Sequence, residues 1–439
     1  MSLWSSLSVG VTGLQTGSNA LNTVAHNLTN VDTDGYTRQQ VEQADRIYTT
    51  LSKTASKISY QQVGLGVYYS NVKQVRDYFL DKTYRQEVGR EDFYSVSSGT
   101  LNEVEDLLGE LQGTQFQKSL SDLWTSVQEL TKDPCNSVTM GAFVSEANEF
   151  LFRAQGVYDG LSSFQDNLNY QVKQKVNQIN ELGKSLLKLN DEIRNVELGG
   201  VEHANDLRDE RNLILDKLAE LADISYREDY FGNAEVQIEG EDFVKGGVCY
   251  EIGLKTDNLT GFYTPFWPQN AEWHLDDMGN RDYDIENALV FDLSRQISSE
   301  LNTDIGGLKS ILLARGDHRA DYTDIETNPE TGESNYDNIS QSVLMNIQAE
   351  FDQLVHNTMR AINSVLEDAA GVKSIADGSG DAQTQALYDA LKAGDEANGD
   401  YYDGKTYKLV KASDLTYMKD NDGSPLLLFK KQTTDSYEK

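Results

Sequence analysis

Residues 26–40 read HNLTNVDTDGYTRQQ, and they mark the point where a helical pattern ends. Asn27, Asn30 and Asp32 have short polar side chains that bond to nearby backbone groups, which disfavours continuation of a helix. Asp34-Gly35 is a turn dipeptide, because glycine readily takes a positive φ. The residues that follow, YTRQQVEQA, alternate as in an extended strand. The stretch therefore predicts a helix, a sharp turn and a strand in succession.

The segment before this turn has apolar residues at the spacing of a coiled-coil seam, with one polar slot at Ser18. Gly10, Gly13 and Gly17 lie in the same stretch, and each lowers helix stability by ~1 kcal/mol relative to alanine. We expect this helix to be weak alone and to fold against other helices. An ordinary amphipathic helix packed on its own domain would show the same pattern. The seam positions are Trp4, Leu7, Val11, Leu14, Leu21, Ala25 and Leu28.

Residues 71–225 have helical periodicity almost throughout. The first of these helices is expected to begin at Val72, and a second to end at Asp133-Pro134. A much longer helix follows, and residues 205–224, NDLRDERNLILDKLAELADI, predict a further one. Apolar residues at coiled-coil period in the longest helix indicate a bundle of antiparallel rods. This bundle seam consists of Ile179, Leu182, Leu186, Leu189 and Ile193.

The pattern changes at about residue 224, where residues alternate with period two around Gly232-Asn233. Helical spacing returns at GLKSILLAR, residues 307–315. The predicted fold class is mainly α with inserted β: a long antiparallel helical bundle with coiled-coil seams, an N-terminal assembly helix and one or more smaller β-rich domains. The expected domains are residues 1–32 (helix and junction), 33–225 (helical bundle), 226–295 (β-rich insertion), 296–370 (returning helices of the bundle) and 371–439 (an irregular, β-containing part of a further domain).

The composition excludes several classes of protein. The 439 residues carry a net charge of −33, which argues against nucleic-acid binding because phosphate contacts need clustered Lys and Arg. No apolar run approaches the ~20 residues that a membrane span requires. The first basic residue is Arg38, so a secretory signal peptide is not expected. Cys135 and Cys249 cannot form a disulfide framework, and we expect both to be small buried hydrophobic residues.

Motifs for chemistry are absent from the sequence. The five histidines are scattered and never stand at the spacing of metal ligands. Residues 30–41 half-match a calcium loop, but position 12 is Val41 where the bidentate Glu would stand. Arg315-Gly316-Asp317 is a chance tripeptide at a predicted helix end. We therefore expect no catalytic, cofactor-binding or metal residues and no enzyme activity.

Two segments resemble a known family. Residues 20–41, ALNTVAHNLTNVDTDGYTRQQV, resemble the start of bacterial flagellar axial proteins, which form rods, hooks and hook-associated parts. Residues 205–225 and GGLKSILLARGD at 306–317 narrow this resemblance to the hook-associated protein 1 family, and the matches extend over roughly residues 1–365. The junction motif shared with the axial proteins is Asn27, Asn30, Thr33, Gly35 and Tyr36.

The resemblance implies a structural subunit at the hook–filament junction that assembles through terminal helices. It implies as partners the hook protein, the second junction protein and neighbouring subunits in a ring, with an export apparatus or chaperone in the cytoplasm. It also implies an extracellular flagellar location without a cleaved signal peptide. Members of that family end in a helix that pairs with the first one, and no such pattern follows residue 371. Truncation at Lys439 is therefore expected.

Three alternatives remain open from the sequence. The chain resembles other axial proteins enough to be a rod or hook subunit. Its 71 Asp and Glu residues leave room for a cell-wall-acting glycosidase, although such a number makes any one carboxylate pair uninformative. The long heptad patterns would equally suit a cytoplasmic coiled-coil adaptor.

Overall fold

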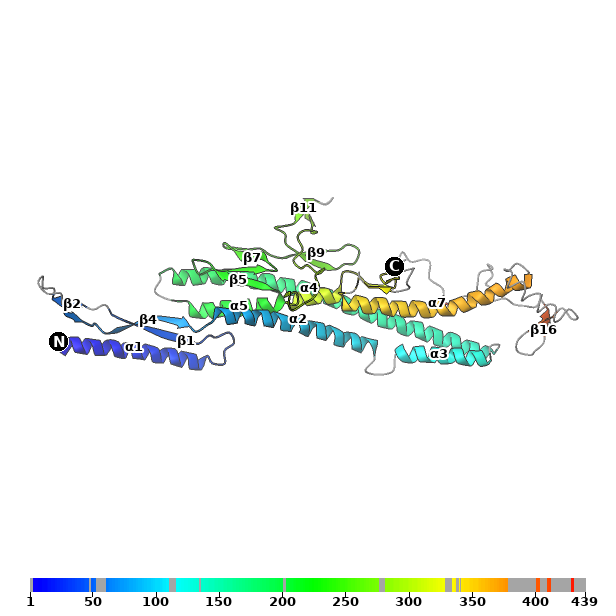
Figure 1. Cartoon of the computed structure of the whole chain (residues 1–439), viewed down its shortest axis with the longest axis horizontal. Helices are drawn as coiled ribbons and strands as arrows, with labels where there is room; N and C mark the ends of the chain where they lie inside the picture. Colours follow the sequence, from blue (N-terminus) through cyan, green and yellow to red (C-terminus); the bar gives the residue numbers. More distant parts are fainter. Residues whose placement is uncertain are drawn as a thin grey trace. The chain divides into compact units, whose positions relative to one another are not determined.

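The structure is a computed structural model of the chain (Figure 1). The described residues form two compact units, and the chain visits each of them twice. Unit 1 consists of Met1–Gly99 and Leu168–Leu313, and unit 2 of Thr100–Asn167 and Ala314–Lys439. The structure describes residues 3–46, 49–52, 61–109, 116–133, 136–199, 203–275, 281–327, 334–336, 339, 341–377, 400–402, 409–411 and 428–429.

The described part of the chain is mainly helical, and the remaining elements are short antiparallel strands. The predicted fold class, mainly α with inserted β, is confirmed. The helices are α1 (Leu3–Thr29), α2 (Tyr78–Leu108), α3 (Phe116–Lys132), α4 (Ser137–Glu197), α5 (Asn205–Leu221), α6 (Gly307–Arg315) and α7 (Val343–Asp377).

The strands pair only as antiparallel neighbours within the described residues. The single four-stranded sheet among them has the order β5-β6-β7-β8, and the others are two-stranded. The strands are β1 (Gln39–Asp45), β2 (Thr49–Ser52), β3 (Gln61–Val63), β4 (Val67–Gln74), β5 (Ile224–Glu228), β6 (Ala234–Ile238), β7 (Glu241–Lys245), β8 (Val248–Cys249), β9 (Gly253–Thr256), β10 (Tyr263–Phe266), β11 (Glu272–Leu275), β12 (Arg281–Asp284), β13 (Glu326–Thr327), β14 (Ser334–Asn335), β15 (Asp400–Tyr402) and β16 (Leu409–Lys411).

One expected helix start is wrong. The helix expected from Val72 begins at Tyr78, and Val72 belongs to β4, where it pairs with Val41 of β1. The segment VYYSNVKQ is rich in aromatic and β-branched residues, which fit a pleated surface better than a helix. Pairing with a strand from residues 39–45 therefore outweighs the helical spacing of its few apolar positions.

The core of unit 1 lies where the second part of α4 meets α5 and the four-stranded sheet. Ile179, Leu186 and Ile193 have no exposed surface, Leu189 is buried and Leu182 is half-buried. These positions recur every three or four residues, so they form one continuous stripe on the helix. The apolar residues that the sheet and α5 contribute to this core include Leu215, Leu218, Val236, Ile238 and Phe243.

Asparagines on α4 attach the β-rich segment to the helix. Asn180 donates its Nδ2–H to the carbonyl oxygen of Ile252 (3.0 Å) and accepts the N–H of the same residue at Oδ1 (2.9 Å). Asn190 brackets Ala234 in the same way, with both distances 2.9 Å. Each carboxamide thus replaces the peptide of a neighbouring strand, so buried backbone groups are paired without a further strand.

The hairpin of β5 and β6 turns at Gly232, which has a positive φ of 79°. Arg211 of α5 is buried there and donates Nη1–H to the carbonyl oxygen of Gly232 (2.7 Å). The same guanidinium pairs with Glu228 at the end of β5. A buried cation is stable only when such partners replace water, so this arginine ties α5 to the hairpin turn.

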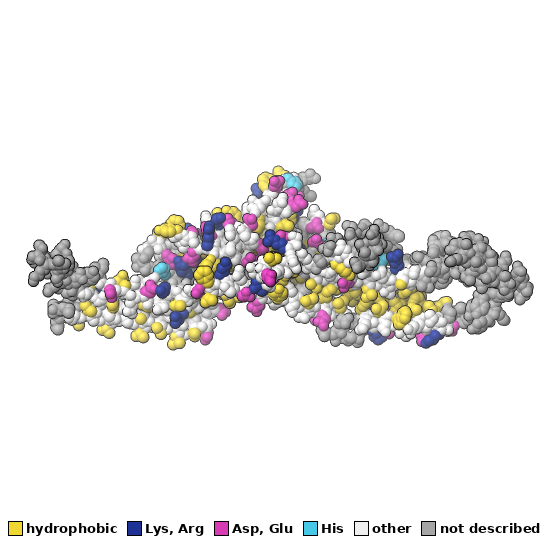
Figure 2. Space-filling view, viewed as in Figure 1, with side chains coloured by type: hydrophobic (Ala, Val, Ile, Leu, Met, Phe, Trp, Pro, Cys, Tyr) yellow, Lys and Arg dark blue, Asp and Glu magenta, His cyan; other side chains and the backbone are white. Residues whose placement is uncertain are grey.

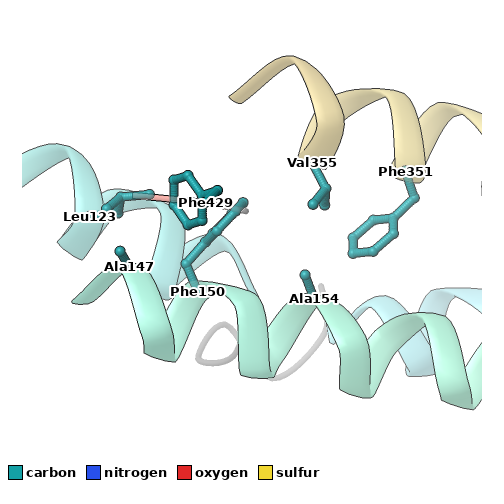
Figure 3. Packing of buried hydrophobic residues seen from close by; sticks show 7 residues of the cluster. All are labelled: Leu123, Ala147, Phe150, Ala154, Phe351, Val355 and Phe429. Atoms are coloured by element: carbon teal, nitrogen blue, oxygen red, sulfur yellow. The ribbon is translucent and has the colours of Figure 1, made fainter. Parts of the chain in front are cut away.

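Unit 2 has its own apolar core, formed by α3, the first part of α4 and α7 (Figure 3). Asn363 of α7 brackets the backbone of Phe429 with two hydrogen bonds, of 2.8 and 3.2 Å. The side chain of Phe429 lies in the core, so this late segment helps to complete it. The buried residues of the cluster are Leu123, Ala147, Phe150, Ala154, Phe351, Val355 and Phe429.

Candidate assembly junction

Helix α1 contacts the hairpin of β1 and β4 through a polar face. Thr16 is 3% exposed and its hydroxyl donates to the carbonyl oxygen of Thr12 (2.9 Å), which is also buried. Ala20, Thr23 and Asn27 continue this stripe at helical spacing and are half-buried. The buried face of α1 therefore consists of small and polar side chains, and its apolar seam lies elsewhere.

Gly66, just before β4, makes this close approach possible. Its φ is 91°, a region that favours glycine. A Cβ at this position would collide with the Thr12 hydroxyl and lie 3.4 Å from the Cα of Val9. The hairpin backbone thus rests directly on α1, which explains why Thr12 and Thr16 rather than leucines occupy the contact.

Asn27 fixes the path of the chain after the helix. Its Nδ2–H donates to the carbonyl oxygen of Gln39 (2.8 Å), and its Oδ1 accepts the N–H of Gln39 (2.9 Å). The hydroxyl of Tyr36 donates to the same Oδ1 (2.8 Å). One side chain therefore joins the last turn of α1, the tyrosine of the turn and the first residue of β1.

The turn also lies against α5. A Cβ at Gly35, whose φ is 77°, would lie 3.2 Å from the Cβ of Leu213, so only glycine fits without strain. Gln39 donates to the Asp206 carboxylate (3.2 Å), and His26 Nε2 lies 3.8 Å from the same group. The junction of helix and strand is thereby anchored on the start of α5.

The hairpin is held to α5 through two further side chains. Gln74 of β4 donates Nε2–H to the Asn205 carbonyl oxygen and to the Asp209 carboxylate, both at 2.8 Å. Asn205 in turn donates to the carbonyl oxygen of Val72 (3.0 Å).

Burial and the nearby carboxylates Asp209 and Asp206 raise the pKa of Tyr36 above its usual value, so its hydroxyl remains a donor at neutral pH.

The apolar seam of α1 is exposed to solvent. Leu14 and Leu21 are 77% and 70% exposed, and Leu7, Val11, Ala25 and Leu28 are exposed as well. Figure 2 shows hydrophobic side chains along this helix, at the lower left of the view. The side chain of Trp4 lies outside the described residues. Contiguous exposed apolar surface of this kind is typical of an interaction site.

The other junction residues have local roles. Asn30 donates Nδ2–H to the carbonyl oxygen of His26 (3.0 Å) at the end of α1. Thr33 donates its hydroxyl to Oδ1 of Asn30 (3.3 Å). Both side chains shape the turn, whereas Asn27, Gly35 and Tyr36 make the contacts that join separate elements.

The sequence reasoning missed the docked face of α1 and the contribution of α5. Thr12, Thr16, Ala20, Thr23 and Asn27 stand three or four residues apart, which is the signal that could have revealed the face. No local pattern could have paired Asp206 with residues 26 and 39, because the contact bridges about 170 residues of chain.

Three sequence features with possible chemical roles can be placed on the described residues. Among the described residues, no three His, Cys, Asp or Glu side chains gather as a metal ion would require. Cys249 is half-buried, and burial raises the pKa of its thiol to about 11, so it is protonated at neutral pH; Cys135 lies outside the described residues. Arg315 is 4% exposed at the end of α6, so the Arg-Gly-Asp tripeptide does not present its arginine to a receptor. None of the described helices is long and apolar enough to cross a membrane.

Comparison with known protein families gives two matches. Residues 101–277 match the helical domain of the flagellar hook-associated protein FlgK. Residues 7–37, which include the whole junction motif, match the flagella basal body rod protein family.

Individual relatives include the flagellar hook-associated protein 1 of Bacillus subtilis, 33% identical over 224 residues. That of Salmonella typhimurium is 26% identical over 216 residues. These matches cover 50% and 49% of this chain, but only 44% and 37% of the relatives, so the chain spans less than half of their length. A solved structure of the flagellar hook junction protein FlgK from Burkholderia pseudomallei has a TM-score of 0.40 and 16% identity, and covers 53% of this chain and 38% of that one. The family-model match and the sequence matches show that this chain is similar to flagellar hook-associated protein 1, chiefly through the helical domain at residues 101–277.

Proposed function

We propose that the protein is a structural subunit of the bacterial flagellum at the hook–filament junction, and that α1 is its assembly element. One observation carries the proposal: α1 has no Asp, Glu, Lys or Arg in its 27 residues, and its apolar seam is exposed. The whole chain is 25% charged, with a net charge of −33. Copies of such a chain repel each other over most of their surface, so an uncharged helix is where they can meet.

We infer that the assembly surface is the seam from Trp4 to Leu28 and that the motif from Asn27 to Tyr36 is the joint behind it. The joint is anchored on α5, so a force on α1 is passed to the helical part of unit 1 through Asn27 and Gly35. Residues 1–32 would then act as an inner assembly segment, distinct from the helical part that follows.

The partners we propose are the hook protein, the second junction protein and neighbouring copies of the chain in a ring. The relatives are named as flagellar proteins, which supports a place in the flagellum outside the cell. Passage through the flagellar export apparatus, with a chaperone in the cytoplasm, is part of the same proposal.

A structural role is better supported than a catalytic one. The relatives carry the name of a hook-associated protein, and the helical-domain match is to that protein rather than to a rod or hook subunit. The cell-wall glycosidase alternative has no comparable support, since within the described part of the chain no cluster of side chains distinguishes one carboxylate pair from the many on the surface.

The test is incorporation into flagella of a bacterium that lacks its own hook-associated protein 1. The variant Leu14→Glu with Leu21→Glu puts two charges on the exposed seam, and we expect it to fold normally but to be missing from sheared hook–filament particles. The matched control is Leu198→Glu with Leu259→Glu, because both leucines are exposed and lie outside α1. Equal incorporation of both variants would contradict the proposal.

A further inference from the structure

The strand β1 has one edge that is not paired within the described residues. Among the described strands, β1 pairs only with β4 (Val67–Gln74). The carbonyl oxygen of Arg38 accepts from Val75, and the N–H of Arg46 donates to Gly66, so even-numbered residues face the hairpin partner. Because hydrogen-bonding direction alternates along a strand, Gln39, Val41 and Gln43 direct their N–H and C=O groups to the other side.

The outward groups of Gln39 are already taken. Asn27 of α1 binds both of them with its carboxamide, at 2.8 and 2.9 Å. These two bonds show that a carboxamide on a helix can take the place of the peptide group of a neighbouring strand. The same pair of groups on Val41 and on Gln43 has no such partner among the described residues.

These outward groups border a groove between β1 and α1. The groove has a volume of about 790 Å³, and its lining includes Val24, Leu28 and Val31 on the helix side and Gln39, Val41 and Gln43 on the strand side. Among the described residues that line it, Arg38 is the only charged one, and none is a carboxylate. In a chain of net charge −33, the groove therefore belongs to the few places where a second copy is not repelled.

The opposite flank of α1 carries a row of exposed carboxamides. With 3.6 residues per turn, Gln15, Asn19 and Asn22 share one flank, and Val24 and Leu28 share the other, with the docked face between them. The three amide side chains are exposed. Adjacent members of the row stand about 5–6 Å apart, and Val41 and Gln43 are about 6.8 Å apart along the strand, so two carboxamides can reach two strand residues together.

We propose that the amide row of α1 in one copy of the chain binds the groove and the open edge of β1 in the next copy. The inference rests on the proposed function and adds, beside the apolar seam, a second contact through which neighbouring copies would associate. The oxygen of each carboxamide can accept the outward N–H of a strand residue, and its NH2 group can donate to the outward C=O of the same residue. The two surfaces differ and lie on opposite flanks, so the contact is heterologous and continues from copy to copy, which leads to a ring or a helical array.

The test joins the two surfaces by a disulfide in assembled flagella. The full chain carries Asn19→Cys and Gln43→Cys together with Cys135→Ser and Cys249→Ser, in a bacterium that lacks its own hook-associated protein 1. After mild oxidation and shearing, we expect a ladder of dimers, trimers and larger species on a non-reducing gel. The control variant carries Ser18→Cys with Gln43→Cys. Ser18 is adjacent to Asn19 in sequence, but its side chain points about 100° away from that of Asn19 on the helix. We expect the control variant to give at least tenfold less cross-linked product than the Asn19 and Gln43 variant.

The outcomes separate this inference from the proposed function. If the Asn19 and Gln43 variant is present in the particles without a ladder, this contact is wrong and the structural role stands. Dimers from the Asn19→Cys or the Gln43→Cys variant alone would indicate a two-fold contact and would also overturn it. A cross-link to a different protein would overturn the inference, because it would mean that this protein, and not a second copy of the chain, occupies the groove. If the chain is missing from the particles with its native sequence, both proposals fail.

Discussion

Asn27 of α1 holds both the N–H and the C=O of Gln39, the first residue of β1. A single carboxamide thus determines how the chain leaves the helix. The same arrangement recurs at Asn180, Asn190 and Asn363, where helices bind backbone segments far away in sequence. Asparagine is suited to this role because its short side chain carries a donor and an acceptor side by side.

Replacing Asn27 by Ala should therefore loosen the junction. Two backbone groups and the Tyr36 hydroxyl lose their partner, which we expect to cost ~1 kcal/mol because the site is only half-buried and water can partly replace the bonds. Hydrogen exchange at the amide of Gln39 should become at least fivefold faster. The control Asn30→Ala removes only local bonds, to the helix end at His26 and to Thr33 in the turn, and unchanged exchange at Gln39 is expected there. Equal protection in both variants would show that Asn27 does not hold the turn.

Gly66→Ala should detach α1 from its hairpin. Alanine is strained at a φ of 91°, and its Cβ would collide with the Thr12 hydroxyl, so we expect a loss of ~1–3 kcal/mol. Amide exchange across residues 9–16 reports the contact directly. Gly64→Ala is the matched control, because a Cβ there meets nothing within 4 Å and its φ is not positive. A Gly66→Ala variant with native exchange would mean that the helix does not rest on this glycine.

Leu186→Ala should be among the costly substitutions in unit 1. The side chain has no exposed surface, and the residue lies in the middle of the α4 seam. Removing it should lower the free energy of unfolding by ~2–5 kcal/mol, depending on how far the cavity collapses. Leu198→Ala, at an exposed position beyond the end of α4, should change it by less than about 0.5 kcal/mol. Chemical denaturation of both variants makes the comparison, and similar small losses would place residue 186 outside the core.

Glu239 should make the stability of unit 1 depend on pH. Burial raises the pKa of its carboxyl from 4.5 to about 7, although Lys309 opposes the shift. The folded protein therefore holds this proton more tightly than the unfolded chain. Its contribution to stability is fully present below about pH 4.5 and is lost as the pH rises through about 7. The loss should amount to ~3 kcal/mol.

The variant Glu239→Gln removes this titration and tests the assignment. Denaturant unfolding at pH 5, 6, 7 and 8 should show a flatter profile for the variant than for the native chain. Glu241→Gln, two residues further and exposed, is the control and should keep the native slope. The assignment is wrong if the native chain and Glu239→Gln lose stability equally over this range.

Several parts of the fold could be predicted because their causes are local. The end of α1 could be predicted from Asn27, Asn30 and Gly35. The asparagine side chains compete for backbone hydrogen bonds, and glycine has no side chain to restrict its backbone, so all three disfavour a helix. α5 and the turn at Gly232 could be predicted in the same way, from helical periodicity and from a turn glycine between alternating residues. The stripe from Ile179 to Ile193 could be recognised because a helix brings every third or fourth residue to one face.

Only the tertiary structure decided which face of α1 is buried. The apolar periodicity of the sequence indicates the leucine seam as the face most suited to burial. The hairpin instead packs on Thr12 and Thr16, because the backbone at Gly66 comes too close for larger side chains. It also decided that Val72 pairs as a strand and that Asp206 anchors the junction. Local periodicity determined where the elements begin and end, whereas contacts between residues far apart in the chain decided which surfaces remain free to bind.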